Sequence, residues 1–315
     1  MDGTVELSRE EQRAARSTLR DVGRFLLVLA VLACVSLAIV SQLGDLPEID
    51  WRFQPVWLIG AIAAIAVLQF LHAAIWRRLV LWLHGDLEPA RSRAIWSASN
   101  MGKYVPTSLL AWVMRISMAE RAGVPRRVTS ASVVYELALI VAASTAVGAY
   151  GVVVMPDLQG HAVRWLVLAV PLLALVAVHP RVFRSLGDAI LRRAGSEPLP
   201  ETLSEARVLL VAAWYAGSLV VAGLGTYAFA RSLHPVDAGD VPTVIAAFSL
   251  ALALSFVAFV LPAGLGAREA GFAAALAPAL PPAVAVAVAI GLRLVQISVE
   301  VAYALITPWF ARRRA

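Results

Sequence analysis

The sequence predicts an all-α polytopic membrane protein with about six transmembrane helices and two broken helical hairpins, arranged as two inverted repeats. Of the 315 residues, 60% are hydrophobic and 15% are charged, whereas an average soluble domain has about 45–50% apolar and about 25% charged residues. The apolar residues form continuous runs, which favours helices over the alternating strands of a β-barrel. A soluble enzyme, a disordered chain and a fibrous protein are therefore excluded.

The net charge of +6 does not indicate a nucleic-acid partner, because most of the 27 Lys and Arg residues lie in short segments beside apolar runs. Basic residues in such places set the orientation of membrane proteins. Cys34 is the only cysteine, so neither a disulfide framework nor a cysteine-based metal cluster is predicted. We expect no metal and no cofactor.

Spanning helices need about 20 apolar residues to cross the hydrocarbon core. The first candidate span, residues 25–43, is too long for a cleaved signal peptide and should stay in the mature protein. The fourth candidate span, residues 164–179, is short and contains Pro171, so its ends are not defined by the sequence. The six candidate spans are residues 25–43, 55–76, 128–151, 164–179, 207–230 and 283–307.

The orientation follows from the basic residues, which are more frequent in cytoplasmic connections. They gather in the N-terminal segment 1–24, in residues 77–127 and 180–207, and at the C-terminus, while the opposite connections hold few. Both termini are therefore predicted to be cytoplasmic, in a bacterial-type inner (plasma) membrane. The opposite connections carry Arg52, Arg164, Arg231 and Arg268.

Two further apolar segments are broken by Gly and Pro. Residues 94–114 contain the run Asn100-Met101-Gly102-Lys103-Tyr104-Val105-Pro106, and residues 241–280 are broken at 261–269. If the first crossed the membrane once, every later connection would change side and the charge pattern would invert. The simplest reading is two re-entrant hairpins, one entering from each side. The second segment could also form two full spans.

The order of elements predicts an internal repeat within a single membrane domain, residues 1–315. Residues 1–155 and 156–315 each read span, span, broken segment, span, and three crossings per half make the second half inverted. Pro106 lies 30 residues before Glu136, and Pro262 lies 31 before Arg293. Inverted-repeat transporters have this arrangement, with broken helices meeting at the substrate site.

The broken segments carry candidate binding residues. Half-helix ends leave backbone N–H groups that suit anionic ligands, and irregular backbone at membrane depth lines cavities or is buried in protein. Gly102, Gly264 and Gly266 permit close backbone approach, and Lys103 and Arg268 add positive charge. The alternative is that both segments are ordinary loops with helix-capping glycines.

Three charged residues, Glu136, Arg293 and Glu300, lie within predicted spans, where each costs about 2.5–3.5 kcal/mol on insertion scales. Glu136 and Arg293 could pair as a buried tie between the repeats. They could instead line a polar path in which arginines bind a phosphate, and a pair that separates would serve as a gate. Glu300 is expected to reach toward the cytoplasmic end.

Helical spacing places polar residues on two faces. Arg293, Gln296 and Glu300 follow i, i+3, i+7 on the last span. The second span repeats this pattern with Gln69, His72 and Trp76.

No catalytic motif competes with a binding role. The five histidines are scattered, and the sequence holds no H-E-x-x-H, no G-x-S-x-G and no Walker loop. The protein is therefore not predicted to be an enzyme, although an intramembrane acid–base reaction at Glu136 or Glu269 stays open.

Both broken segments resemble a known family. The run 100–106, followed by Arg115, Gly123 and Tyr135-Glu136, is similar to the first signature of the lysylphosphatidylglycerol synthase transmembrane-region family. Residues 261–269, followed by Arg293, resemble its second signature. The family includes the flippase half of bacterial multiple peptide resistance factors. The likeness covers nearly the whole chain.

The resemblance implies a flippase-like protein that binds an anionic lipid headgroup, a phospholipid or a polyprenyl-phosphate-linked glycan, and moves it between leaflets. Lys103, Arg115, Arg268 and Arg293 would hold the phosphate, and Glu136 and Glu269 would balance charge and gate. With no ATP site, movement would be downhill or ion-coupled.

Two departures concern the substrate: Pro106-Thr107-Ser108 replaces a Pro-Gly-Gly-rich turn, and Tyr135-Glu136-Leu137 keeps only the acid of a Glu-Arg pair. No aminoacyl-transferase domain is expected after Ala315. One rival function is a non-catalytic membrane partner that presents lipid to a glycosyltransferase or another lipid-modifying enzyme, and the other is that the protein itself is a lipid-modifying enzyme. The oligomeric state and the lipid are not predicted.

Overall fold

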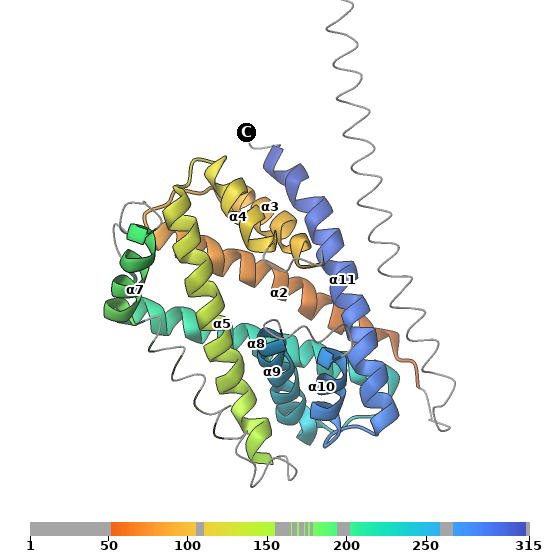
Figure 1. The fold of residues 1–315 in the computed structure, drawn as a ribbon. Helices are drawn as coiled ribbons and strands as arrows, with labels where there is room; N and C mark the ends of the chain where they lie inside the picture. The colour runs from red at the N-terminus through yellow and green to blue at the C-terminus, as the bar shows by residue number, and fades with distance from the viewer. Residues whose placement is uncertain are drawn as a thin grey trace, which may run out of the picture. The chain divides into compact units, whose positions relative to one another are not determined.

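The computed structural model describes residues 52–104, 110–154, 179–193, 202–258 and 267–312, together with four isolated residues between 165 and 176. All regular structure in these residues is helical (Figure 1). The predicted span 25–43 and most of the predicted span 164–179 lie outside the described residues, as do Gly264 and Gly266.

Four predicted spans are confirmed as long helices. These are α2 (Pro55–Trp82), α5 (Arg126–Val154), α8 (Glu205–Leu233) and α11 (Pro282–Arg312). Each has enough length and apolar character to cross a membrane, and large apolar side chains on their outer faces, such as Val56, Ile59 and Leu305, are exposed. The described part of the chain is therefore a multi-pass membrane protein.

The second broken segment differs from a symmetric hairpin. Its first arm, α9 (Val241–Ala258), has 18 residues, about 27 Å, and adds one further candidate span to the four helices above, for five in the described residues. Its second arm, α10 (Ala267–Leu276), has ten residues, about 15 Å, and prolines follow soon after its end. The described part of this second arm is therefore shorter than the roughly 20 residues that a spanning helix needs.

The first broken segment folds into two short helices. They are α3 (Pro89–Asn100), which continues into the 3₁₀ turn η1 (Met101–Tyr104), and α4 (Leu110–Glu120). Each helix covers about 17 Å, roughly half the hydrocarbon core. Gly123, with φ of +91°, ends the turn after α4 and allows α5 to begin at once.

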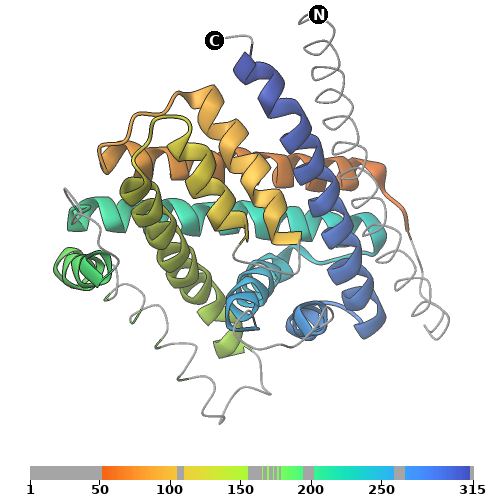
Figure 2. The same cartoon turned by 45° about the horizontal axis from the view of Figure 1, so that its top comes forward.

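The helices α2 and α8 pack side by side and run antiparallel (Figures 1 and 2). At one end, the Gln54 N–H donates to the Ser232 carbonyl at 2.8 Å, and at the other end the Trp82 and Trp214 rings stack. Figure 2 shows α5 and α11 crossing this pair. The central pair thus joins the two halves of the sequence.

The packing partners of the two halves correspond. The helix α5 packs on α9, α8, α4 and α2, and α11 packs on α3, α2, α10 and α8. Exchanging α2 with α8, α3 with α9, α4 with α10 and α5 with α11 converts one set into the other. The exchange also relates the contact of α3 with α4 to that of α9 with α10.

A further helix, α7 (Pro180–Arg193), is amphipathic and carries exposed arginines. Its Phe183 is buried and stacks on the Tyr135 ring of α5, with ring centroids 3.9 Å apart. The Tyr135 hydroxyl also accepts a hydrogen bond from the Leu203 N–H just before α8. Tyr135 therefore connects α5 with two segments that the sequence places on the cytoplasmic side.

Candidate functional site

The carboxylate of Glu300 lies at the centre of the candidate site. Its Oε1 accepts hydrogen bonds from Lys103 Nζ at 2.7 Å and from Gln69 Nε2 at 3.3 Å, and its Oε2 accepts one from the Tyr104 hydroxyl at 2.7 Å. Glu300 is only 7% exposed. The expectation that it reaches toward the cytoplasmic end is wrong, because α2 and η1 enclose its face of α11 and supply its donors.

These contacts give Glu300 three donors from two segments that lie far from it in sequence. A buried carboxylate is costly unless paired and hydrogen-bonded, and Lys103 supplies the charge while Tyr104 and Gln69 complete the shell. The Lys103 side chain keeps 34% of its surface exposed. The cation therefore borders the enclosed part of the site and remains accessible from outside it.

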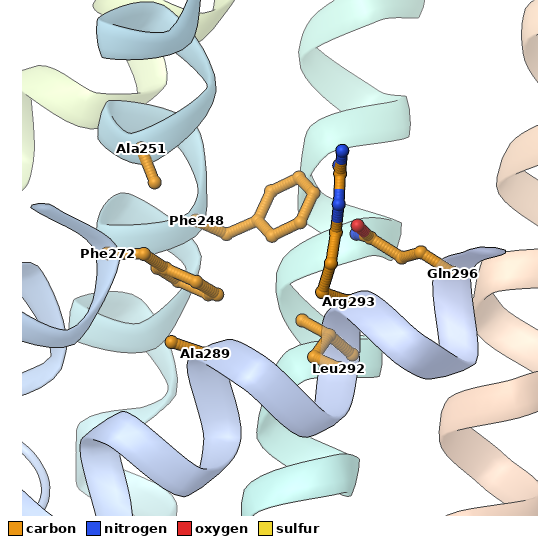
Figure 3. A pocket seen from close by; sticks show the side chains of 7 residues that line it. All are labelled: Phe248, Ala251, Phe272, Ala289, Leu292, Arg293 and Gln296. Atoms are coloured by element: carbon orange, nitrogen blue, oxygen red, sulfur yellow. The ribbon is translucent and has the colours of Figure 1, made fainter. Parts of the chain in front are cut away.

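Arg293 lies two turns before Glu300 on the same face of α11. Its guanidinium is 5.6 Å from the centre of the Tyr104 ring, a distance typical of a cation–π contact. Arg293 also lines a small cavity together with Gln296, and Figure 3 shows Phe248 of α9 extending toward it. The other lining residues are Ala251, Phe272, Ala289 and Leu292.

Arg293, Gln296 and Glu300 therefore share one face of α11, as the spacing predicts, but they contact different parts of the protein. Arg293 and Gln296 lie at the cavity between α9, α10 and α11, and Glu300 lies at the contact with η1 and α2. Tyr104 joins the two environments, because its ring faces Arg293 and its hydroxyl binds Glu300.

A second ion pair lies between α4 and α5. Arg115 Nη1 is 2.5 Å from Glu136 Oε2, and Arg115 Nε donates to Ser99 Oγ at 3.1 Å. The guanidinium also lies 5.4 Å from the Trp76 ring and 5.5 Å from the Trp96 ring. Arg115 is 3% exposed, so its charge is enclosed by partners from three other helices, α2, α3 and α5.

Of the two alternatives for Glu136 and Arg293, the buried tie between them is absent from the described residues. Glu136 pairs instead with Arg115, which the turn around Gly123 brings back against the first turns of α5. This pair lies within the first half of the chain. The partner of Glu136 thus comes from a neighbouring helix and not from the other half of the chain.

The predicted face of α2 runs past both ion pairs. Gln69 donates to Glu300, and one turn later His72 Nε2 is hydrogen-bonded to Ser218 Oγ at 3.0 Å, while its ring meets the edges of Trp96 and Tyr215. Another turn on, Trp76 donates to Ser132 Oγ at 3.1 Å. The three residues form one inward face, as the spacing predicts.

Gly102 has a steric role in the first hairpin. A Cβ atom at this position would lie 2.8 Å from both the Cα and the N of Ala111, so only glycine lets η1 approach the start of α4. The predicted close approach is therefore real, and its partner in this structure is the protein backbone.

The remaining predicted residues belong to the second hairpin. Arg268 and Glu269 stand in the first turn of α10, but their side chains are outside the described part of the chain, and so are Gly264 and Gly266. Sequence reasoning missed Tyr104, Ser99 and the roles of Gln69 and Trp96 as direct partners of charged groups. Tyr104 alone had a local signal, because it follows Lys103 in the interrupted run.

Long apolar helices connected through enclosed ion pairs define an α-helical, multi-pass membrane protein with polar groups in its interior. The family model described as Lysylphosphatidylglycerol synthase TM region matches residues 25–303, and the chain belongs to this family. The match confirms the resemblance seen in the two broken segments. No curated protein and no solved structure matches the chain.

Proposed function

We propose that the protein binds the anionic headgroup of a membrane lipid, a phospholipid or a polyprenyl-phosphate-linked glycan, and moves it between leaflets. The observation that carries this proposal is the polar face of α11. There Arg293 lines a cavity, and Tyr104 connects it to Glu300, which forms an ion pair with Lys103. A phosphate group is the ligand that two such cations would share, because guanidinium groups bind phosphate oxygens bidentately.

The proposed binding step exchanges one anion for another. A phosphate at Arg293 would reach the Tyr104 ring edge and attract Lys103, which is the more exposed member of its ion pair. Lys103 would then leave Glu300, which keeps its hydrogen bonds from Tyr104 and Gln69. Since Lys103 belongs to η1, this exchange would loosen the contact between the first hairpin and α11.

Arg115 and Glu136 have a different proposed role. Arg115 already contacts Glu136, Ser99 and two tryptophan rings, so it contributes positive potential and holds α4 on α5 in this conformation. Its separation from Glu136 would be the gating step. Arg268 and Glu269, at the start of α10, are the proposed phosphate partner and charge balance from the second hairpin.

The packing pattern supports an inverted repeat. The exchange of α2–α5 with α8–α11 leaves the set of helix contacts unchanged, and α2 and α8 run antiparallel. In transporters of this kind the broken helices from the two repeats meet near the midplane and form the substrate site. The short helices α3, α4 and α10 would be the re-entrant elements, with both chain termini cytoplasmic in an inner membrane.

The test is a lipid-movement assay with the full-length protein in liposomes. Fluorescent phosphatidylglycerol is the first probe and a fluorescent polyprenyl phosphate the second, and dithionite reports the fraction that reaches the outer leaflet. We expect Arg293→Ala to lower the rate at least tenfold and Arg293→Lys to lower it less. Arg121→Ala removes an exposed arginine after α4 and serves as the matched control.

The outcomes separate the candidate functions. Unchanged movement of both probes in Arg293→Ala would overturn the proposal. If the wild-type protein retains a phosphate lipid through purification but moves neither probe, the lipid-presenting partner is the better description. A chemically altered lipid recovered from the vesicles would instead indicate an enzyme.

A further inference from the structure

A cluster of two arginines and two tryptophans lies where the end of α2 meets the start of α8. The Trp82 and Trp214 rings stack with centroids 5.6 Å apart and planes 21° apart. The guanidinium carbon of Arg78 lies 5.8 Å from the Trp82 ring centre, and that of Arg207 lies 5.4 Å from the same centre. We call these four residues the Arg–Trp cluster.

The Arg–Trp cluster is remote from the Glu300 carboxylate at the centre of the candidate site. Trp82 is the last residue of α2, thirteen residues after Gln69 and therefore about 20 Å further along the helix. Arg207 is in the first turn of α8. The ends of spanning helices lie at the headgroup level, where tryptophan is enriched and arginine meets lipid phosphates.

Both arginines of the cluster are exposed, and among the described residues neither makes an ion pair. The neighbouring Arg77 differs, because its Nε donates to the Leu87 carbonyl at 2.7 Å and so holds the loop after α2. Glu205, close to Arg207 in sequence, lies against another residue, with its Oε1 3.2 Å from His179 Nε2. The two guanidinium groups therefore keep exposed hydrogen-bond donors at this end of the helix pair.

The opposite end of the α2–α8 pair provides a comparison. There Arg231 lies 4.7 Å from the Trp57 ring centre and donates to the Tyr227 hydroxyl at 2.8 Å. That end has one arginine on its aromatic pair, with a protein acceptor already in place. In the Arg–Trp cluster two cations lie on the same Trp82 ring. The cluster lies at the end of the helix pair that the distribution of basic residues predicts to be cytoplasmic.

We propose that the Arg–Trp cluster is a second lipid site, which binds the phosphate headgroup of an anionic phospholipid and joins α2 to α8. The exposed guanidinium groups supply charged donors from both helices, and the stacked indoles form an apolar floor at headgroup depth. A zwitterionic headgroup would bind less well, because its own cation is repelled by the two arginines. This site holds its lipid in place and does not depend on the lipid movement proposed above.

Native mass spectrometry of the full-length protein tests this site. The protein is released from detergent after incubation with phosphatidylcholine, phosphatidylglycerol or cardiolipin, and the bound lipids are counted. We expect retained phosphatidylglycerol or cardiolipin but little phosphatidylcholine on the wild type, and at least a fivefold loss in Arg78→Gln/Arg207→Gln. Stronger retention of cardiolipin than of phosphatidylglycerol would indicate that one lipid supplies a phosphate to each arginine.

The control is Arg126→Gln/Arg184→Gln, which removes two exposed arginines from α5 and α7 and changes the net charge equally. It should retain lipid as the wild type does, and Arg78→Lys/Arg207→Lys should retain an intermediate amount. Unchanged retention in Arg78→Gln/Arg207→Gln, equal loss in the control, or equal retention of phosphatidylcholine would each overturn the site. If only Arg293→Ala loses lipid, the bound lipid belongs to the candidate site at Arg293, and the proposal for the Arg–Trp cluster is overturned, whatever the lipid-movement assay shows.

Discussion

Lys103 Nζ lies 2.7 Å from Glu300 Oε1, although the two residues are 197 positions apart in the sequence. The contact joins the 3₁₀ turn in the middle of the first hairpin to the last helix. Gln69 of α2 binds the same carboxylate oxygen. Three separate segments thus converge on one enclosed charge, and the stability of the fold should depend on it.

Replacing Glu300 with Gln should destabilise the protein by about 1–3 kcal/mol, because it removes the charge that Lys103 and Tyr104 stabilise and leaves their donors poorly matched. Thermal unfolding in detergent, followed by size-exclusion of the folded fraction, measures the loss. The double variant Lys103→Met/Glu300→Gln should recover part of it, since neither charge is then left alone. Equal stability of Glu300→Gln and wild type would contradict the assignment.

Replacing Arg115 with Lys should also destabilise the protein, by about 1–3 kcal/mol. An ammonium group keeps the charge for Glu136 but cannot reproduce the guanidinium contacts with Ser99, Trp76 and Trp96. Arg121→Lys, on an exposed residue just after α4, is the matched control and should be neutral. Chemical unfolding followed by tryptophan fluorescence reports both variants, and an equal midpoint for the two would refute the role of these contacts.

Two glycines of α8 should respond in opposite ways to alanine. A Cβ at Gly223 would lie 2.6 Å from the Ile245 Cα, so Gly223→Ala should separate α8 from α9 and cost about 1–3 kcal/mol. No atom lies within 4 Å of a Cβ at Gly217, and Gly217→Ala should be neutral or stabilise by up to about 1 kcal/mol. Melting temperatures of the two variants in one detergent test this; a drop for both would mean that helix contacts do not decide the result.

The orientation can be measured with single cysteines in a Cys34→Ser background. Arg121 is exposed between α4 and α5, and Gly239 is exposed between α8 and α9. If both termini are cytoplasmic, an impermeant maleimide added to intact bacterial cells should label Gly239→Cys and spare Arg121→Cys until the cells are broken. The reverse labelling pattern would invert the predicted topology.

Local sequence patterns predicted the elements well. The helices α2, α5, α8 and α11 follow from apolar runs of sufficient length, and the inward faces of α2 and α11 follow from the 3.6-residue period. These features depend on residues within one or two turns of each other. The family resemblance came from short runs of the same kind.

Partner choice was harder to predict. A pairing of Glu136 with Arg293 was one of two alternatives, because the two residues hold matching positions of the repeat, yet the tight turn at Gly123 places Arg115 beside Glu136. Glu300 was expected near the membrane surface because only its distance from the helix end was visible. The enclosure of its face by η1 and α2 is a property of the assembled bundle.

The low content of charged residues, together with long apolar runs, by itself determined that this chain is a multi-pass helical membrane protein, because the hydrocarbon core acts on each segment separately. Only the tertiary structure decided that α9 is a long helix beside a short α10, and that Lys103 and Arg115 hold Glu300 and Glu136. Which charges meet depends on how distant helices cross. The free energy of a buried ion pair is therefore set by packing and not by spacing along the chain.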